Sequence, residues 1–211
     1  MSSFKSFSYQ IISDPHGEKI KLRKEAEKII LLGDYGKASK LRKGEKGALK
    51  ELYETSIVFL ESLKGKEVYA LLGNADINIK SKLLKFFKEN NITYAGNKVI
   101  RIGNLNALFL DFFMEKWWCL KNKPEKLEKA EKMEEEVKTI LIKKPQVDII
   151  FSHNVPYGFF DNNRYGSKLL LKMIKELKPR YCFAGHNHLN ALSLIGKTVT
   201  ISVYKSLVVN I

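Results

Sequence analysis

Short apolar runs and amphipathic stretches alternate along the first half of the chain. A continuous apolar run such as 29–32 is typical of a parallel strand buried on both faces, because neither face meets water. Apolar residues that recur every three to four positions, as they do over 48–63, predict a helix with one buried face. Strands are therefore predicted over 9–13, 29–32 and 68–72, helices over 48–63 and 79–90, and a short charged helix over 18–28.

Hairpins and one long charged helix distinguish the second half. The pair Gly103-Asn104 separates two apolar runs, which predicts a hairpin. We expect a loop over 114–122, which holds both tryptophans, and a solvated helix with a narrow buried stripe over 123–144. Strands are predicted over 99–102, 105–113, 147–151, 180–184, 191–195, 198–203 and 206–211, and a helix over 166–177. The chain has no repeat or linker, so we expect one domain, 1–211, of the α/β class with parallel strands and an antiparallel complement.

Composition narrows the class of protein. The 211 residues are enough for a full hydrophobic core, and 37 Lys and Arg against 23 Asp and Glu give a net charge of +14. This excess favours anionic partners such as phosphate esters, nucleic acid or acidic lipid, although a solvated Lys/Glu surface of the heat-adapted kind explains it equally well. Cys119 and Cys182 form no CxxC pattern, and no stretch approaches the ~18 apolar residues of a membrane span. We therefore expect a soluble, cytoplasmic protein with no membrane partner.

The four histidines are the main indication of function. Each lies at the downstream end of an apolar run, and two Asp and one Asn follow other predicted strands in the same way. In open α/β sheets, ligands bind beyond the carboxyl ends of the strands. In an extended chain, residues two apart project the same way, so Asp14 with His16, and His186 with His188, are expected to face one site. The candidate site residues are Asp14, His16, Asp34, Asn74, His153, His186 and His188.

This set of side chains predicts a metal centre. Four imidazoles, two carboxylates and one amide oxygen suit borderline divalent ions (Mn²⁺, Fe²⁺, Zn²⁺ or Ni²⁺) better than Mg²⁺ or Ca²⁺, which prefer oxygen ligands throughout. Seven ligands are too many for one tetrahedral ion. They suit two ions about 3.5–4 Å apart that are bridged by a carboxylate, as in two-metal phosphatases and nucleases.

The order of these motifs resembles that of the calcineurin-like metallophosphoesterase family. The similarity rests on five motifs between residues 14 and 188. They are Asp14-Pro15-His16 for D-x-H, Gly33-Asp34 for G-D, Gly73-Asn74-Ala75-Asp76 for G-N-H-D, Ser152-His153, and Gly185-His186-Asn187-His188 for G-H-x-H. The segment 154–161, with Gly166-Ser167, is similar to the Pro-Gly-Asp loop of some bacterial and archaeal members.

The resemblance implies a four-layer fold, a β-sandwich of mixed sheets flanked by helices. It also implies a phosphoesterase, most simply a phosphodiesterase, in which metal-bound hydroxide attacks phosphorus. One metal would be held by Asp14, His16, Asp34 and His188. The other would be held by Asp34, Asn74, His153 and His186, with Asp34 bridging. Asp34, Asn74 and His186 are also counted as catalytic residues.

One position departs from the family pattern. Where the G-N-H-D motif has a histidine, which stabilises the transition state or protonates the leaving group, this chain has Ala75. Tyr35, Asp76 and Tyr157 are candidate replacements by sequence position alone. General-acid help is typically worth ~10²–10⁴-fold, so we expect a preference for good leaving groups such as aryl phosphodiesters.

Three functions stay open on the sequence. The first is a phosphodiesterase whose partner is a phosphate-ester substrate, with a nucleotide as one candidate. The second is a nuclease acting on DNA or RNA, which the charge supports but which is less favoured. The third is a non-catalytic metal-binding scaffold, and in each case a monomer or a homodimer is compatible with the sequence. The basic segment 37–46 follows Asp34 and is a candidate for binding an anionic substrate, with a solvated lysine loop as the alternative.

Overall fold

The computed structural model describes residues 8–161 and 165–211. Within these residues the strands form two mixed sheets of five and six strands, which pack face to face. The first sheet has the order β11-β1-β2-β3-β4, with bounds Lys205–Asn210, Ser8–Ser13, Lys28–Leu31, Glu67–Ala70 and Thr93–Tyr94. The second has the order β5-β6-β7-β8-β10-β9, with bounds Lys98–Ile102, Leu105–Leu110, Ile149–Ser152, Tyr181–Ala184, Thr198–Ser202 and Ala191–Ile195.

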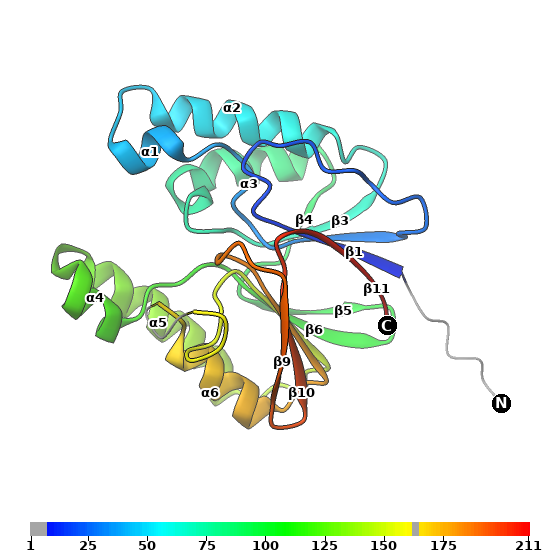
Figure 1. Cartoon of the computed structure of the whole chain (residues 1–211), viewed down its shortest axis with the longest axis vertical. Coiled ribbons are helices and arrows are strands. Elements are labelled where there is room, and N and C mark those ends of the chain that lie inside the picture. The colour runs from blue at the N-terminus through cyan, green and yellow to red at the C-terminus, as the bar shows by residue number, and fades with distance from the viewer. Residues whose placement is uncertain (1–7, 162–164) are drawn as a thin grey trace.

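Helices cover the outer face of each sheet, so the protein has four layers (Figure 1). The helices on the first sheet are α1 (Ser39–Lys43), α2 (Ala48–Glu61), the short 3₁₀ helix η1 (Asp76–Ile79) and α3 (Lys80–Glu89). Those on the second are α4 (Lys116–Asn122), the 3₁₀ helix η2 (Pro124–Lys126), α5 (Leu127–Ile142) and α6 (Lys168–Leu177). The α/β class and the flanked β-sandwich expected from the sequence are therefore confirmed.

The central strands of both sheets are parallel. β1, β2 and β3 run parallel in the first sheet, and β6, β7 and β8 run parallel in the second. Antiparallel strands lie at the margins, where β11 pairs with β1, β5 with β6, and β9 with β10. Since β4 is also parallel to β3 and β10 to β8, each sheet presents the carboxyl ends of four adjacent parallel strands along one edge.

Alternation along each strand divides the core into three layers. In β1, Ile11 packs between the sheets whereas Ile12 packs under α2 and α3. Between the sheets, Phe109, Phe151 and Phe183 form a continuous aromatic stack with ring centroids 5.0 Å and 5.5 Å apart. These strands have continuous apolar runs because both of their faces are buried.

Two predicted elements are wrong. Residues 18–28 contain no helix: the segment is irregular with a turn at residues 24–25, and the side-chain amide of Gln10 donates to Lys21 O at 2.9 Å and accepts from Arg23 N at 2.9 Å. Residues 114–122 are not all loop, because Lys116–Asn122 form helix α4. Residues 162–164 of the loop that precedes α6 lie outside the described residues. No helix in the described ranges is long and apolar enough to cross a membrane.

A buried carboxylate ties the two sheets together near their carboxyl ends. Asp111 follows β6, and its Oδ1 accepts the backbone N–H of Leu72, just beyond β3, at 2.7 Å. Its Oδ2 accepts the Tyr94 hydroxyl and lies 3.6 Å from Lys80 Nζ. The Phe112 N–H adds a bond to Leu72 O at 2.7 Å. The strand ends that carry the candidate site are thus fixed relative to each other.

We expect Asp111→Ala to lower the free energy of unfolding by about 1–3 kcal/mol for each buried donor left unpaired. Urea denaturation measures this change. Asp111→Asn keeps an acceptor for the Leu72 N–H and should cost less. A change below about 0.5 kcal/mol in Asp111→Ala, the range usual for surface substitutions, would contradict this role.

Candidate metal centre

The seven predicted residues converge where the two sheets bring their carboxyl ends together. They follow five different parallel strands and come from both sheets. Asp14 and His16 follow β1, Asp34 follows β2, Asn74 follows β3, His153 follows β7, and His186 and His188 follow β8. The contacts among them form two adjoining groups.

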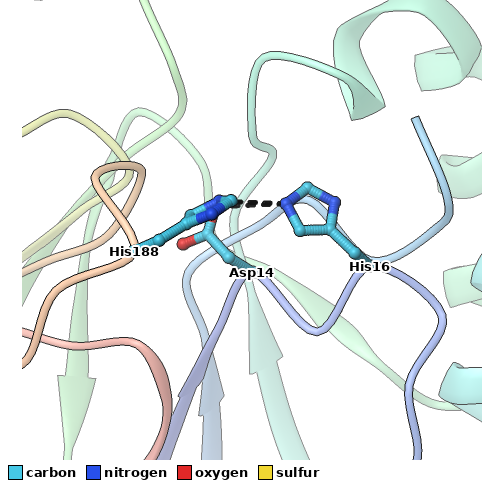
Figure 2. Close-up of side chains that lie close together, drawn as sticks. All are labelled: Asp14, His16 and His188. Carbon is cyan, nitrogen blue, oxygen red and sulfur yellow. Dashed lines mark hydrogen bonds and ion pairs between the residues drawn. The ribbon is translucent and has the colours of Figure 1, made fainter. Parts of the chain in front are cut away.

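The first group contains Asp14, His16 and His188 (Figure 2). The Nε2 atoms of the two imidazoles lie 3.1 Å apart and point toward one another. Asp14 Oδ1 is 3.5 Å from Nε2 of His188 and 3.9 Å from Nε2 of His16. This oxygen is buried and accepts no hydrogen bond within the described part of the chain. An orphaned carboxylate oxygen beside two imidazole nitrogens is a suitable cation site.

The other oxygen of Asp14 is fully engaged. Asp14 Oδ2 accepts the Ser13 hydroxyl and the backbone N–H of His186, the latter at 2.9 Å. Burial alone would raise the pKa of Asp14, but the contacts with His188, His153 and Ser13 outweigh it and hold the pKa below its usual range. The side chain is therefore an anion held in one orientation.

The second group contains Asn74, His153 and His186. Asn74 Oδ1 lies 3.0 Å from His153 Nε2 and 2.8 Å from His186 Nδ1, and the two nitrogens are 3.2 Å apart. Asp34 Oδ2 is 3.9 Å from His153 Nε2. Asp14, Asp34 and His153 also have ligand atoms within 4.8 Å of one another, so Asp14 and Asp34 lie between the two groups.

Backbone carbonyls set the tautomers of two histidines. Nδ1 of His153 donates to Leu32 O at 2.7 Å, and Nδ1 of His16 donates to Gly36 O at 3.3 Å. A carbonyl only accepts, so in the neutral form of each ring the Nε2 lone pair faces the site, the arrangement usual for metal-ligating histidine. Burial would lower the pKa of His153, but the nearby Asp34 and Asp14 outweigh it and raise that pKa, so a bound cation would compete with a proton at this ring. Burial, with His153 nearby, lowers the pKa of His186 to about 3, which keeps that ring neutral as a ligand must be.

The turns that carry these residues are strained. Five of the seven have a positive φ: Asp14 (52°), His16 (46°), Asp34 (57°), His186 (73°) and His188 (54°). Non-glycine residues rarely adopt this region, and such residues cluster at functional sites. The expectation of extended backbone at the two paired motifs is therefore wrong, since left-handed turns bring the paired side chains to the site.

Asp76 organises two of the loops without lying among the candidate ligands. Its buried carboxylate accepts the backbone N–H groups of Asp34 (2.6 Å), Gly73 (2.9 Å) and Tyr35 (3.2 Å). Burial and the nearby Asp34 raise its pKa to about 7. Asp34 Oδ1 in turn accepts the Ala75 N–H at 2.9 Å, and a Cβ at position 73 would lie 2.1 Å from that oxygen. The glycine and the aspartate of this motif thus position Asp34.

The candidate replacements for the missing histidine are placed elsewhere. Tyr35 is fully buried, and its hydroxyl donates to Leu71 O. Asp76 is equally buried and occupied by the three amides above. Tyr157 packs against the Trp117 ring at 5.6 Å. Tyr35 and Asp76 are therefore excluded as proton donors to a leaving group.

A cavity of about 280 Å³ adjoins the second group, and the sequence did not reveal it. Asn74 and His186 form one wall, and side chains of α4, η2 and α5 form the other. The charged helix predicted over 123–144 is thus part of the site region. Its one signal in the sequence is the spacing of Lys123, Lys126 and Lys129, which places three cations on one side of the segment.

The basic segment 37–46 contributes less than its composition suggests. Lys40 pairs with Glu51 at 3.5 Å and Lys43 with Glu45 at 3.7 Å. Burial is the main cause of the low pKa of His186, and the charge of Arg42 is one of the smaller causes. Arg42 is therefore the residue of this segment whose charge acts on the site.

A two-sheet sandwich with Asp, Asn and His at the ends of parallel strands defines the class of metal-dependent phosphoesterases. Residues 10–190 match the calcineurin-like phosphoesterase family, and the chain belongs to that family. It is a hydrolase that acts on phosphoric ester bonds. No curated protein matches the chain in sequence.

Solved structures share the fold at low identity. Phosphopantetheinyl hydrolase (PptH) from Mycobacterium tuberculosis is 12% identical with a TM-score of 0.66, over 95% of this chain and 90% of that one. TT1561 of Thermus thermophilus is 13% identical with a TM-score of 0.59, over the same shares of the two chains. GAP50, the anchor in the inner membrane complex of Plasmodium, is 18% identical with a TM-score of 0.52, over 93% and 71%.

We expect Asp76→Ala to weaken Mn²⁺ binding by about 10–100-fold although it removes no candidate ligand, because it releases the loops that hold Asp34 and Asn74. Calorimetric titration of chelator-treated protein measures the affinity. Asp148→Ala is the matched control, since Asp148 accepts the Asn106 N–H at 2.8 Å before β7 begins, at the opposite end from the site. Equal affinities in the two folded variants would refute the role of Asp76.

Proposed function

We propose that the protein is a phosphodiesterase that works with two divalent cations. The observation that supports this proposal best is the crowding of acceptor atoms in two adjoining groups, with the buried Asp14 Oδ1 unpaired between imidazoles. Acceptor atoms 3.0–3.1 Å apart need a proton or a cation between them, and a bound cation would satisfy several of these atoms at once. Two adjoining groups, with Asp14 and Asp34 both near His153, suit two neighbouring ions better than one.

The proposed ligand sets follow the two groups. Asp14, His16, Asp34 and His188 hold one ion, and Asp34, Asn74, His153 and His186 hold the other. Asp34 is the proposed bridge because its Oδ1 is fixed by the Ala75 N–H while Oδ2 faces His153. Four imidazoles favour Mn²⁺, Fe²⁺, Zn²⁺ or Ni²⁺, with Mn²⁺ as the first ion to test. Such ions polarise phosphoryl oxygens and lower the pKa of bound water.

Ala75 shapes the proposed specificity. It is 2% exposed, its backbone N–H donates to Asp34, its carbonyl accepts from Asn78, and its methyl side chain has no proton to donate. Tyr35 and Asp76 are occupied elsewhere, so the departing oxygen receives no proton from either. Diesters whose leaving group is stable as an anion are therefore the proposed substrates.

The proposed setting is the cytoplasm. Cys119 and Cys182 are both buried and unbridged, which agrees with a reducing compartment. The proposed partner is a small phosphate ester of the nucleotide class.

We expect His188→Ala to reduce the bound Mn²⁺ from about two ions per chain to about one, and the rate on bis-p-nitrophenyl phosphate by at least about 10²-fold, since one ligand set loses an imidazole. Elemental analysis after dialysis measures the stoichiometry. Lys197→Ala, an exposed change in the turn between β9 and β10, is the control. Two ions retained by His188→Ala would show that the ligand set is wrong.

We expect methyl p-nitrophenyl phosphate to be hydrolysed at least about 10²-fold faster than methyl phenyl phosphate at saturating Mn²⁺, because the poorer leaving group lacks general-acid help. Steady-state assays of the two esters measure the ratio. Similar rates would mean that another group donates the proton. Failure to hydrolyse either ester, with both ions bound, would favour a metal-binding scaffold.

A further inference from the structure

The cavity beside the second ligand group has a chemistry of its own. At about 280 Å³ it is close to the lower end of the ~300–1,000 Å³ typical of small-molecule sites. Asn74 and His186 line one end, so a phosphate held at the candidate metal centre would extend its substituent into this space. The volume suits one nucleoside-sized group and is too small to enclose a polymer.

The wall of the cavity is aromatic. Phe112 joins the ligand group to the cavity, because its ring centroid lies 5.9 Å from those of both His153 and His186. Trp117 and Trp118 are half-buried and continue this wall along α4. Flat rings that keep one part exposed to a cavity favour stacking with the ring of a ligand.

The wall is held in place before any ligand binds. Trp117 Nε1 donates to Glu115 Oε2 at 2.7 Å. The other Glu115 oxygen accepts the Ser167 hydroxyl and the Leu169 N–H, the latter at 3.0 Å, which ties the start of α4 to the start of α6. A preformed wall reduces the conformational entropy lost on binding.

One part of the cavity lining is positively charged. Lys123, Lys126 and Lys129 belong to this part, and none of them forms an ion pair within the described ranges. Lysines of α5 that lie outside the cavity behave differently: Lys132 and Lys138 pair with glutamates of the same helix at 2.6 Å and 2.7 Å. The cavity lining therefore carries three lysines without a carboxylate partner, one of them over the Trp118 ring at 5.9 Å, and offers a site for a second anionic group.

We infer, on the basis of the function proposed above, that the substrate is a small nucleotide diester that carries a second phosphate. The scissile phosphate lies at the metal centre, the nucleoside lies against the aromatic wall, and the second phosphate meets the lysines. Hydrolysis adds water across the P–O bond of the leaving group that is more stable as an anion, releases that group with a proton from water and leaves a phosphate monoester, and the second phosphate is unchanged.

Three esters with the same scissile bond test this inference: methyl p-nitrophenyl phosphate, thymidine 5′-(p-nitrophenyl phosphate), and the same compound with a 3′-phosphate. We expect kcat/KM to rise about tenfold when the nucleoside is added and about tenfold again with the 3′-phosphate. The second gain should come mainly from KM and shrink as salt is added, since exposed charges are screened.

The variant Lys126→Ala/Lys129→Ala should reduce the preference for the 3′-phosphate to less than about threefold. Lys121→Ala/Lys132→Ala removes the same charge from α4 and α5 outside the cavity and should keep the full preference. A preference that is missing in the wild type, or equal in the two double variants, overturns the inference. If the wild-type protein hydrolyses none of the three esters and no bis-p-nitrophenyl phosphate, the proposed function is overturned instead.

Discussion

The buried carboxylate of Asp14 joins the two sheets at the point where the candidate centre forms. It follows β1 in the first sheet, and its Oδ2 accepts the His186 N–H from the loop after β8 in the second. That bond leaves Oδ1 without a donor in the described part of the chain and directs it at His16 and His188. A buried anion with one unpaired oxygen is costly unless a cation completes it. Closure of the sandwich and affinity for metal are therefore coupled through one side chain.

The same coupling explains how the site tolerates backbone strain. Left-handed conformations at non-glycine residues cost of order 1–3 kcal/mol each, and five of the seven candidate ligands adopt them. Asp, Asn and His bear this conformation better than most residues, and they are also the residues that bind borderline metals. The strained turns follow strands that are buried on both faces, such as β2, where Ile29, Ile30 and Leu31 are fully buried. Rigid strands on both sides therefore hold the turns in a geometry that no isolated loop would keep.

The sequence predicted most of the strands and a set of candidate residues that lie together, because both follow from local patterns. Continuous apolar runs mark β2 and β7, and a histidine or an aspartate after such a run lies at a strand end wherever the sheet is placed. What it missed depends on distant contacts. The segment 18–28 is irregular and not helical because Gln10, from a neighbouring strand, binds its backbone, and α4 begins where Glu115 meets Ser167 of another element. The left-handed φ at His186 and the cavity under α5 likewise arise only from packing.

Ala75 and the cavity both bear on how this site would accelerate hydrolysis. The chain has four histidines, and all of them lie in the two ligand groups, so no imidazole is left to carry a proton. A rate that cannot come from general-acid help must come from positioning and from charge. The segment between β6 and β7 supplies both, because it places an aromatic wall and three unpaired lysines next to Asn74 and His186. In the proposed substrate, binding energy from the second phosphate would orient the scissile bond, and it would raise kcat only as far as that orientation is reached in the transition state. Under the proposed function, discrimination between substrates therefore rests both on the stability of the leaving group as an anion and on the group beyond the scissile phosphate.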